Sequence, residues 1–250
     1  MHLLTSNLAQ VVLLLIGLAF KDADGHSVFP LSPLEILWAN LITSSPLALG
    51  LGLEEATPDI LKRSPRSLKK GVFTTDLVRD QMIYGTCMGT VSLMAFMVVA
   101  YAASGNGYHD LATGCNEDAA MGCERVFRAR ATTFATLSFL LLVTSWEVKH
   151  FHKSLFNMDE RWPGPLSFFK TIYRNTFLFW SVVAGFVMIF PVVYIPKLNT
   201  EVFKHRGLTW EWGVVFGGVV LYIGLIEMWK MAKRRTGLGV DRNLIAAGEV

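Results

Sequence analysis

Three polar side chains lie in the middle of the apolar stretch between residues 32 and 53. Asn40, Thr43 and Ser44 stand at i, i+3 and i+4, so on a helix they share one face. A polar group at bilayer depth must find an internal partner or a water-lined cavity, which makes these amides and hydroxyls candidates for a functional role. With Pro46 behind them, the sequence predicts a helix that is broken in the middle. Such a break frees backbone carbonyls beside side-chain oxygens, and this combination is typical of cation sites near the middle of a membrane.

A second group of polar side chains lies in the first apolar stretch, near residues 3–20. Asn7 and Gln10 are three residues apart and Ser6 and Gln10 are four apart, so a helix places them on one face. Only a short connection separates this stretch from the next, so the two can point neutral oxygen ligands at one another. Hydrogen bonds that hold membrane helices together produce the same pattern, and the spacing favours neither interpretation. Glu147, at the end of a later apolar stretch, is either an interfacial carboxylate or a functional one.

The composition determines which class of protein must position these groups. Hydrophobic residues make up 52% and charged residues 17% of the 250 residues, and the mean hydropathy is +0.40. These values exclude a soluble domain of this length and indicate a membrane protein with several spans. The net charge of +3 is small, and the sequence has no basic, aromatic-interleaved surface. We therefore expect the lipid bilayer as a partner and no nucleic acid.

Six apolar stretches are long enough to cross about 30 Å of hydrocarbon at about 20 residues each. The sequence predicts an all-α membrane protein, a bundle of six transmembrane helices near residues 3–20, 34–53, 82–103, 131–148, 176–195 and 212–230. Most of the 23 lysines and arginines follow the second, fourth and sixth stretches, including the basic run 230–235, which we interpret as a membrane anchor. The positive-inside rule then predicts that both termini lie in the cytosol.

Several motifs closely resemble the C-terminal membrane half of P-type cation-transporting ATPases. They are LSPLEILWANLITSS, the following GLGLEEATPDILKRSPR and the earlier SNLAQVV, together with CERVFRARATTFATLSFLLLVTSWEV and GLIEMWKMAKR. The resemblance covers essentially the whole chain and implies that the six stretches are the fifth to tenth helices of such a pump. The sequences of these motifs are most similar to the fungal sodium/potassium-exporting branch and less similar to the calcium-pumping branch. The plasma membrane is therefore the expected location.

The resemblance also implies a set of cation ligands. These positions are Asn7, Gln10, Asn40, Thr43, Ser44 and Glu147. At Gln10 and Ser44 this chain has neutral groups where animal calcium pumps carry acids. Fewer fixed negative charges suit a monovalent ion better than a divalent one, because a doubly charged ion leaves more uncompensated charge in a low dielectric. We expect Na⁺ or K⁺ as the transported ion, with calcium as a lesser alternative.

Two further features acquire a role through the resemblance. Asp59 and Arg63 match the family pattern in the loop that couples the ion-site helices to the phosphorylation domain. Cys115 and Cys123 both lie in the 104–130 connection, which the predicted topology puts outside the cytosol, where disulfides persist. The CERVF segment resembles the family loop in which such a pair occurs, so we predict a disulfide between them.

The catalytic motifs of a P-type pump are not in this sequence. It contains no DKTGT, whose aspartate would form the phosphoenzyme, and no TGES or GDGxND. We expect that the chain begins inside a longer protein's helix and that it alone does not hydrolyse ATP. ATP and Mg²⁺ then belong to the complete pump, and the N-terminal half of the pump is a partner. The alternatives are an inactive truncated fragment and an independent six-span channel or secondary transporter, although the internal repeats that the latter predicts are not visible.

Overall fold

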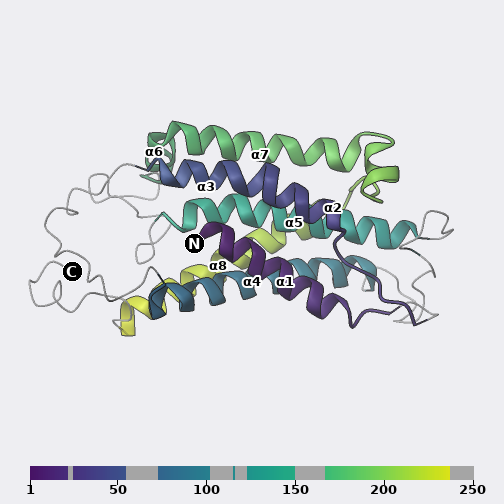
Figure 1. The fold of residues 1–250 in the computed structure, drawn as a ribbon, viewed down its shortest axis with the longest axis horizontal. Helices are drawn as coiled ribbons and strands as arrows, with labels where there is room; N and C mark the ends of the chain where they lie inside the picture. The colour runs from purple at the N-terminus through teal and green to yellow at the C-terminus, as the bar shows by residue number, and fades with distance from the viewer. Residues whose placement is uncertain (22–24, 55–72, 102–114, 116–122, 150–166, 237–250) are drawn as a thin grey trace, which may run out of the picture.

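The computed structural model describes residues 1–21, 25–54, 73–101, 115, 123–149 and 167–236. Within these ranges every regular element is a helix, and an isolated bridge joins Lys21 to Ser27 in a connection. The elements shown in Figure 1 are α1 (His2–Gly17), α2 (Pro33–Trp38), η1 (Ala39–Ser44), α3 (Ser45–Gly52), α4 (Thr75–Ala100), α5 (Glu124–Glu147), α6 (Ser167–Arg174), α7 (Thr176–Tyr194), η4 (Leu198–Val202) and α8 (Trp212–Thr236). The expected all-α class is confirmed for this part of the chain.

Five of the described helices are long and apolar enough to cross a membrane. They are Pro33–Gly52, Thr75–Ala100, Glu124–Glu147, Thr176–Tyr194 and Trp212–Thr236. α1 is apolar as well, but its 16 residues extend only about 24 Å at 1.5 Å per residue. The described residues therefore establish five candidate spans and do not establish the predicted sixth.

Local sequence signals explain where several helices begin. At the start of α2, the Ser32 hydroxyl accepts a hydrogen bond from the N–H of Glu35, while the Glu35 carboxylate accepts one from the N–H of Ser32. This reciprocal capping satisfies two otherwise unpaired donors of the first turn. Thr74 caps α4 through Leu77, and Asn175 caps α7 through Leu178. Each cap is a side-chain oxygen that accepts from a backbone N–H.

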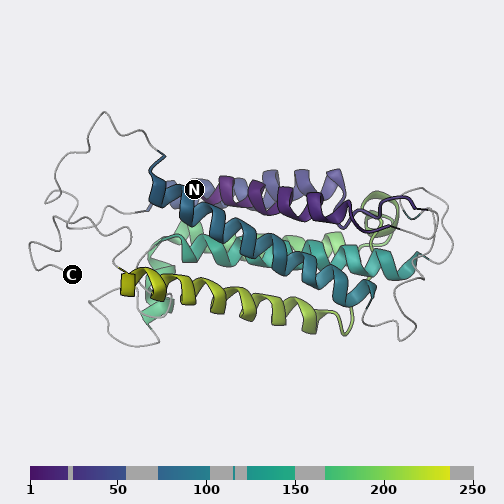
Figure 2. The same cartoon turned by 90° about the horizontal axis from the view of Figure 1, so that it is seen from below.

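α5 is the central helix of the bundle and is buried along almost its full length. α4 and α8 pack on one side of it, and η1, α3 and α7 pack on another. Figure 2 shows α8 on the side of the bundle away from α1. α5 is rich in threonine, and the hydroxyls of Thr132, Thr133, Thr136 and Thr144 each donate to the carbonyl four residues earlier, at 2.6–2.8 Å. The helix therefore satisfies these polar groups by itself and can occupy the interior.

Small residues let α1 approach α4 closely. A Cβ atom at Gly85 would lie 2.8 Å from a methyl carbon of Leu8, and one at Gly89 would lie 2.8 Å from the carbonyl oxygen of Ala9. Close contact through glycine is the usual way in which membrane helices gain packing energy. These two positions set how deeply α1, with Ser6 and Gln10, sits against the bundle.

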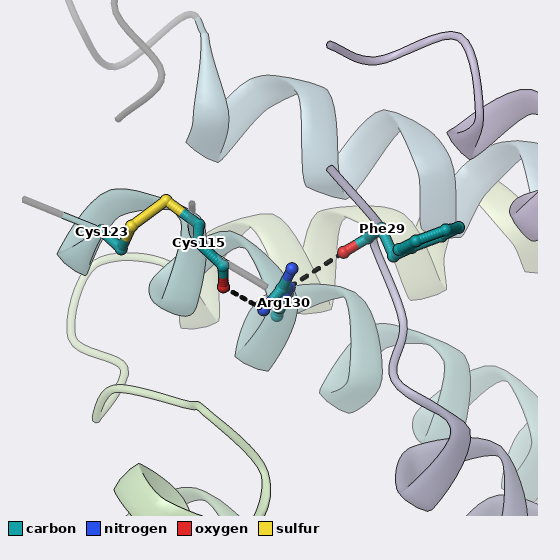
Figure 3. The surroundings of a disulfide bond; sticks show 4 residues. All are labelled: Phe29, Cys115, Cys123 and Arg130. Carbon is teal, nitrogen blue, oxygen red and sulfur yellow. Dashed lines mark hydrogen bonds between the residues drawn. A yellow bond between two sulfur atoms is a disulfide. The ribbon is translucent and has the colours of Figure 1, made fainter. Parts of the chain in front are cut away.

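A disulfide joins Cys115 to Cys123 at one end of the bundle, which we call the disulfide end. Beside it, Arg130 of α5 donates to the carbonyl of Phe29 at 2.9 Å and to the carbonyl of Cys115 at 3.1 Å (Figure 3). The guanidinium is buried, and because it has several N–H donors it serves two backbone segments at once. One residue of α5 therefore ties the α1–α2 connection and the disulfide to the core.

Candidate functional site

The middle of the helix Pro33–Gly52 is a π-helix rather than a break. η1 joins α2 to α3 without interruption. The predicted interruption is wrong because the backbone goes on hydrogen bonding through a wider, i→i+5 turn. The N–H and the hydroxyl of Ser45 both donate to the carbonyl of Asn40, the hydroxyl at 2.8 Å. Pro46 follows directly and, having no N–H, donates to no carbonyl of this turn.

Gln10 of α1 and Asn40 of η1 form a reciprocal amide pair. The Gln10 amide nitrogen donates to the Asn40 side-chain oxygen at 3.2 Å, and the Asn40 amide nitrogen donates to the Gln10 oxygen at 3.0 Å. Gln10 is only 3% exposed and Asn40 is half-buried. Each amide thereby satisfies one donor and one acceptor of the other away from water. The pair brings together two of the residues that the sequence predicts as ligands.

Two serine hydroxyls extend this pair. Ser6 Oγ lies 3.3 Å from the side-chain oxygen of Asn40 and 3.3 Å from Ser44 Oγ. It also accepts from the Gln10 amide at 3.4 Å. Both serines are fully buried. We call Ser6, Gln10, Asn40 and Ser44 the amide–hydroxyl cluster.

Asn7 and Thr43 lie outside the hydrogen bonds of the cluster. The side chain of Asn7 is exposed, because α1 turns Ser6 and Gln10 toward η1 and consecutive residues of a helix are about 100° apart. Thr43 is buried on η1, but none of the cluster's hydrogen bonds involves its hydroxyl. Sequence spacing showed that both Ser6 and Asn7 can share a face with Gln10, and the predicted ligand set contained Asn7 and not Ser6.

Glu147 is held by a lysine instead of joining the cluster. Both Glu147 and Lys230 of α8 are 0% exposed, and their side chains form an ion pair. The Lys230 ammonium also donates to the backbone carbonyl of Glu147 at 3.1 Å. The interpretation of the run 230–235 as a membrane anchor is therefore wrong for Lys230 and Lys233, since both side chains are buried inside the bundle. No sequence signal identifies this partner, because the two residues are 83 positions apart.

Glu147 and the cluster are also separated along the bundle axis. His2 at the start of α1 contacts the carbonyl of Leu141 at 3.1 Å, and α1 and α5 run in opposite directions (Figure 2). Glu147 is six residues beyond Leu141, about 9 Å, and Gln10 is eight residues beyond His2 in the other direction, about 12 Å. Along the helices, Glu147 is therefore about 15 Å from Ser6 and about 20 Å from Gln10.

Asp59 and Arg63, the predicted coupling residues, lie outside the described residues. The end of α3 just before them is connected to two other helices. Glu54 forms an ion pair with Lys149 at 3.1 Å and accepts a hydrogen bond from the Asn175 amide at 2.8 Å. The helix that carries η1 is thus tied at this end to α5 and α7.

The donor set of the cluster is neutral oxygen. Two amides and two hydroxyls supply it, and within the described ranges no group of three or more His, Cys, Asp or Glu is arranged to hold a metal ion. Amide and hydroxyl oxygens coordinate hard cations without adding charge. The cluster can therefore bind a singly charged cation or serve as a hydrogen-bonded contact between helices.

Comparisons with known proteins identify relatives of the chain. A family model described as "Cation transporting ATPase, C-terminus" matches residues 28–232. The chain is 44% identical over 237 residues to the sodium/potassium exporting P-type ATPase cta3 of Schizosaccharomyces pombe, with 94% of this chain and 23% of that protein covered. It is 40% identical over 237 residues to the sodium/potassium exporting P-type ATPase 1 of Saccharomyces cerevisiae, with 94% and 21% covered. It is 29% identical over 236 residues to the calcium-transporting ATPase 1 of Bacillus cereus, with 94% and 24% covered. The chain thus spans less than a quarter of the length of these relatives.

Proposed function

The chain belongs to the C-terminal part of the cation-transporting P-type ATPases, and we propose that it carries a monovalent-cation site of a pump that exports Na⁺ or K⁺. It is an integral membrane protein with five helices suited to the bilayer. The observation that carries the proposal is the neutral amide–hydroxyl cluster between α1 and η1. The higher identity to sodium/potassium exporters than to a calcium pump supports the same ion class.

The absence of carboxylates from the cluster favours a single charge on the ion. Desolvation of an ion becomes much more costly as its charge increases, and a divalent ion normally recovers that cost from carboxylate ligands. Ser6, Gln10, Asn40 and Ser44 supply dipoles only. Binding of Na⁺ or K⁺ at these oxygens requires the two amide N–H donors to turn away from the oxygens that they now share. Part of the binding energy is therefore spent on opening the amide pair.

The remaining ligands and the topology belong to the same proposal. Thr43 adds an oxygen from η1, and Asn7 adds one from the exposed side of α1, which the rest of the pump would cover. α1 would be a sixth crossing, with both termini in the cytosol, the disulfide end outside it and the plasma membrane as the location. Phosphorylation by ATP with Mg²⁺ would take place on the rest of the pump and reach the cluster through the loop that contains Asp59 and Arg63.

The test is cation-dependent phosphoenzyme formation by a complete pump. A suitable pump is the Schizosaccharomyces pombe ATPase cta3 with its matching segment replaced by this chain. Asn40→Ala removes an oxygen and leaves the Gln10 amide without its partner, so the sodium midpoint should rise on the order of tenfold or more. Asn199→Ala is the matched control, because Asn199 is a buried asparagine at the disulfide end that donates to the carbonyl of Val193.

The two possible roles of the cluster give different results. A ligand role predicts a raised midpoint in Asn40→Ala and an unchanged midpoint in Asn199→Ala. A purely structural role predicts that both variants lower the melting temperature and that neither changes the midpoint. Calcium in place of sodium should produce no phosphoenzyme, and a calcium-dependent signal would contradict the monovalent assignment.

A further inference from the structure

The Lys230–Glu147 pair has the composition of an occupied cation site. Both acceptors of the Lys230 ammonium belong to Glu147, one carboxylate oxygen and the backbone carbonyl. Both side chains are fully buried between α5 and α8. A buried lysine is unfavourable unless a partner neutralises it, and a buried carboxylate has the same requirement. Each residue therefore depends on the other to remain charged inside the bundle.

Further oxygen groups surround this pair. The Tyr222 hydroxyl of α8 hydrogen bonds to the Thr144 hydroxyl of α5 at 2.8 Å, one turn from Glu147. The second carboxylate oxygen of Glu147 and the hydroxyl of Tyr84 of α4 are both buried, and neither has a hydrogen-bond partner among the described residues. Oxygen groups from α4, α5 and α8 thus gather in this region. The Lys230 ammonium supplies the positive charge that neutralises the Glu147 carboxylate.

A second ion pair of the same kind lies one turn along α8. Lys233 donates to the carboxylate of Asp80 on α4 at 2.6 Å, and Trp229 donates to the same carboxylate at 2.9 Å. α8 therefore supplies two ammonium groups, each directed at a buried carboxylate of a neighbouring helix. Neither carboxylate is left with a free charge for a mobile ion.

We propose that Lys230 is a tethered cation that keeps Glu147 occupied, so that Glu147 is not a ligand of the transported ion. The proposal rests on the function proposed above and assigns the transported ion to the amide–hydroxyl cluster, about 15–20 Å away along the helices. The physical reason is competition. A mobile Na⁺ would have to lose its water and displace an ammonium that is already desolvated and that the chain holds in place at a high effective concentration.

Two variants of the complete pump remove or move the carboxylate without leaving a buried charge unpaired. Glu147→Gln with Lys230→Met replaces the ion pair by neutral groups of similar size, a change that proteins often tolerate. Glu147→Lys with Lys230→Glu keeps the pair and moves the carboxylate from α5 to α8. In both variants we expect the sodium midpoint of phosphoenzyme formation to stay within about twofold of wild type. Asn40→Ala should raise it on the order of tenfold in the same assay.

The midpoint is the diagnostic quantity, because a change in folding alters the maximal phosphoenzyme level instead. A midpoint raised tenfold or more in either double variant, with a wild-type melting temperature, would show that Glu147 is a ligand and would overturn the proposal. Lys230→Arg is the conservative control and should retain the wild-type curve. Failure of the proposed function is a separate result, since it appears as an unchanged midpoint in Asn40→Ala.

Discussion

The two buried polar regions of this chain differ in the charge of their side chains. The amide–hydroxyl cluster contains no charged group and pairs its own donors and acceptors. Glu147 and Lys230 are both charged groups, and they neutralise one another. An ion that enters the first region meets only dipoles, whereas an ion that approaches the second must replace a lysine. At the scale of single residues, this difference is the reason for proposing the cluster, and not Glu147, as the site of a mobile cation.

Ser6 provides a residue-scale test of the cluster. Ser6→Ala removes a hydroxyl that contacts Asn40, Ser44 and Gln10, so we expect the sodium midpoint of the complete pump to rise severalfold, for a loss of about 1 kcal/mol. Ser138→Ala is the matched control, because Ser138 is a buried serine whose hydroxyl has no partner among the described residues. It should leave the midpoint unchanged, and equal effects of the two substitutions would contradict the assignment of Ser6 to the site.

Glu211, just before α8, provides a pH-dependent test. Burial alone would raise the pKa of its carboxyl, but hydrogen bonds from Thr209 and Arg128 together lower the pKa below the ordinary value of 4.5. A lowered folded-state pKa contributes stability above the unfolded value, and this stability is lost as the pH falls through the folded value. Glu211→Gln should therefore lower the melting temperature of the purified protein at pH 7, by the loss of about 1–3 kcal/mol.

The difference in melting temperature between wild type and Glu211→Gln should become smaller as the pH falls below about 4.5. Melting curves of the two proteins, recorded in parallel from pH 7 to the acid limit of folding, measure it. A difference that stays constant over this range would show that the Glu211 charge does not stabilise the fold.

Two elements determine the geometry of the cluster. The π-helix η1 brings Asn40 and Ser44 to the α1 side of the long helix, and the glycines of α4 set the depth of α1. A widened turn rotates the residues that follow it relative to an α-helix, which is one reason why such turns occur at functional sites. The contacts of Ser6 and Gln10 therefore depend on how closely α1 can approach α4.

Gly89→Ala tests the close packing of α1 on α4. The new Cβ would lie 2.8 Å from the Ala9 carbonyl and 3.0 Å from Val12, so α1 must move away at a cost of about 1–3 kcal/mol. We expect a lower melting temperature and a raised sodium midpoint. Gly217→Ala, where a Cβ meets nothing within 4 Å, should be neutral or stabilise by up to about 1 kcal/mol through helix propensity. A midpoint unchanged in Gly89→Ala would mean that the α1–α4 distance does not control the site.

At the scale of the whole molecule, α5 joins the two ends of the bundle. At the disulfide end, Arg130 holds the backbone near Cys115 and Phe29. At the other end, Glu147 binds α8, and Lys149 binds Glu54 beside α3. Because the disulfide needs an oxidising compartment, it supports the orientation proposed from the lysines and arginines.

The orientation of the disulfide end can be measured in intact cells. We expect a membrane-impermeant phosphine followed by an impermeant maleimide to label Cys115 and Cys123 without permeabilisation. A Cys87→Ala background removes the remaining cysteine, and omission of the phosphine should abolish the labelling. Labelling that appears only after the cells are permeabilised would place this end in the cytosol and reverse the proposed topology.

The sequence by itself determined the class and the family of this protein. Apolar stretches of membrane length and motifs such as LSPLEILWANLITSS are local properties of the chain, so they can be recognised without neighbours. The all-helical class is confirmed by the described residues, and membership of the P-type ATPases by the comparisons. Gln10, Asn40 and Ser44 of the cluster were among the ligands predicted from the sequence, because amides and hydroxyls are conspicuous in an apolar stretch, whereas Ser6 was not predicted as a ligand.

Only the tertiary structure decided which of these residues meet. Ser6 rather than Asn7 faces Asn40, because helix rotation is set by the packing of α1 against α4 and η1. Glu147 meets Lys230 rather than the cluster, because two residues 83 positions apart pair through the register of α5 and α8, which pack side by side. Register and rotation depend on all the side chains that pack at once, so spacing within one helix does not specify them.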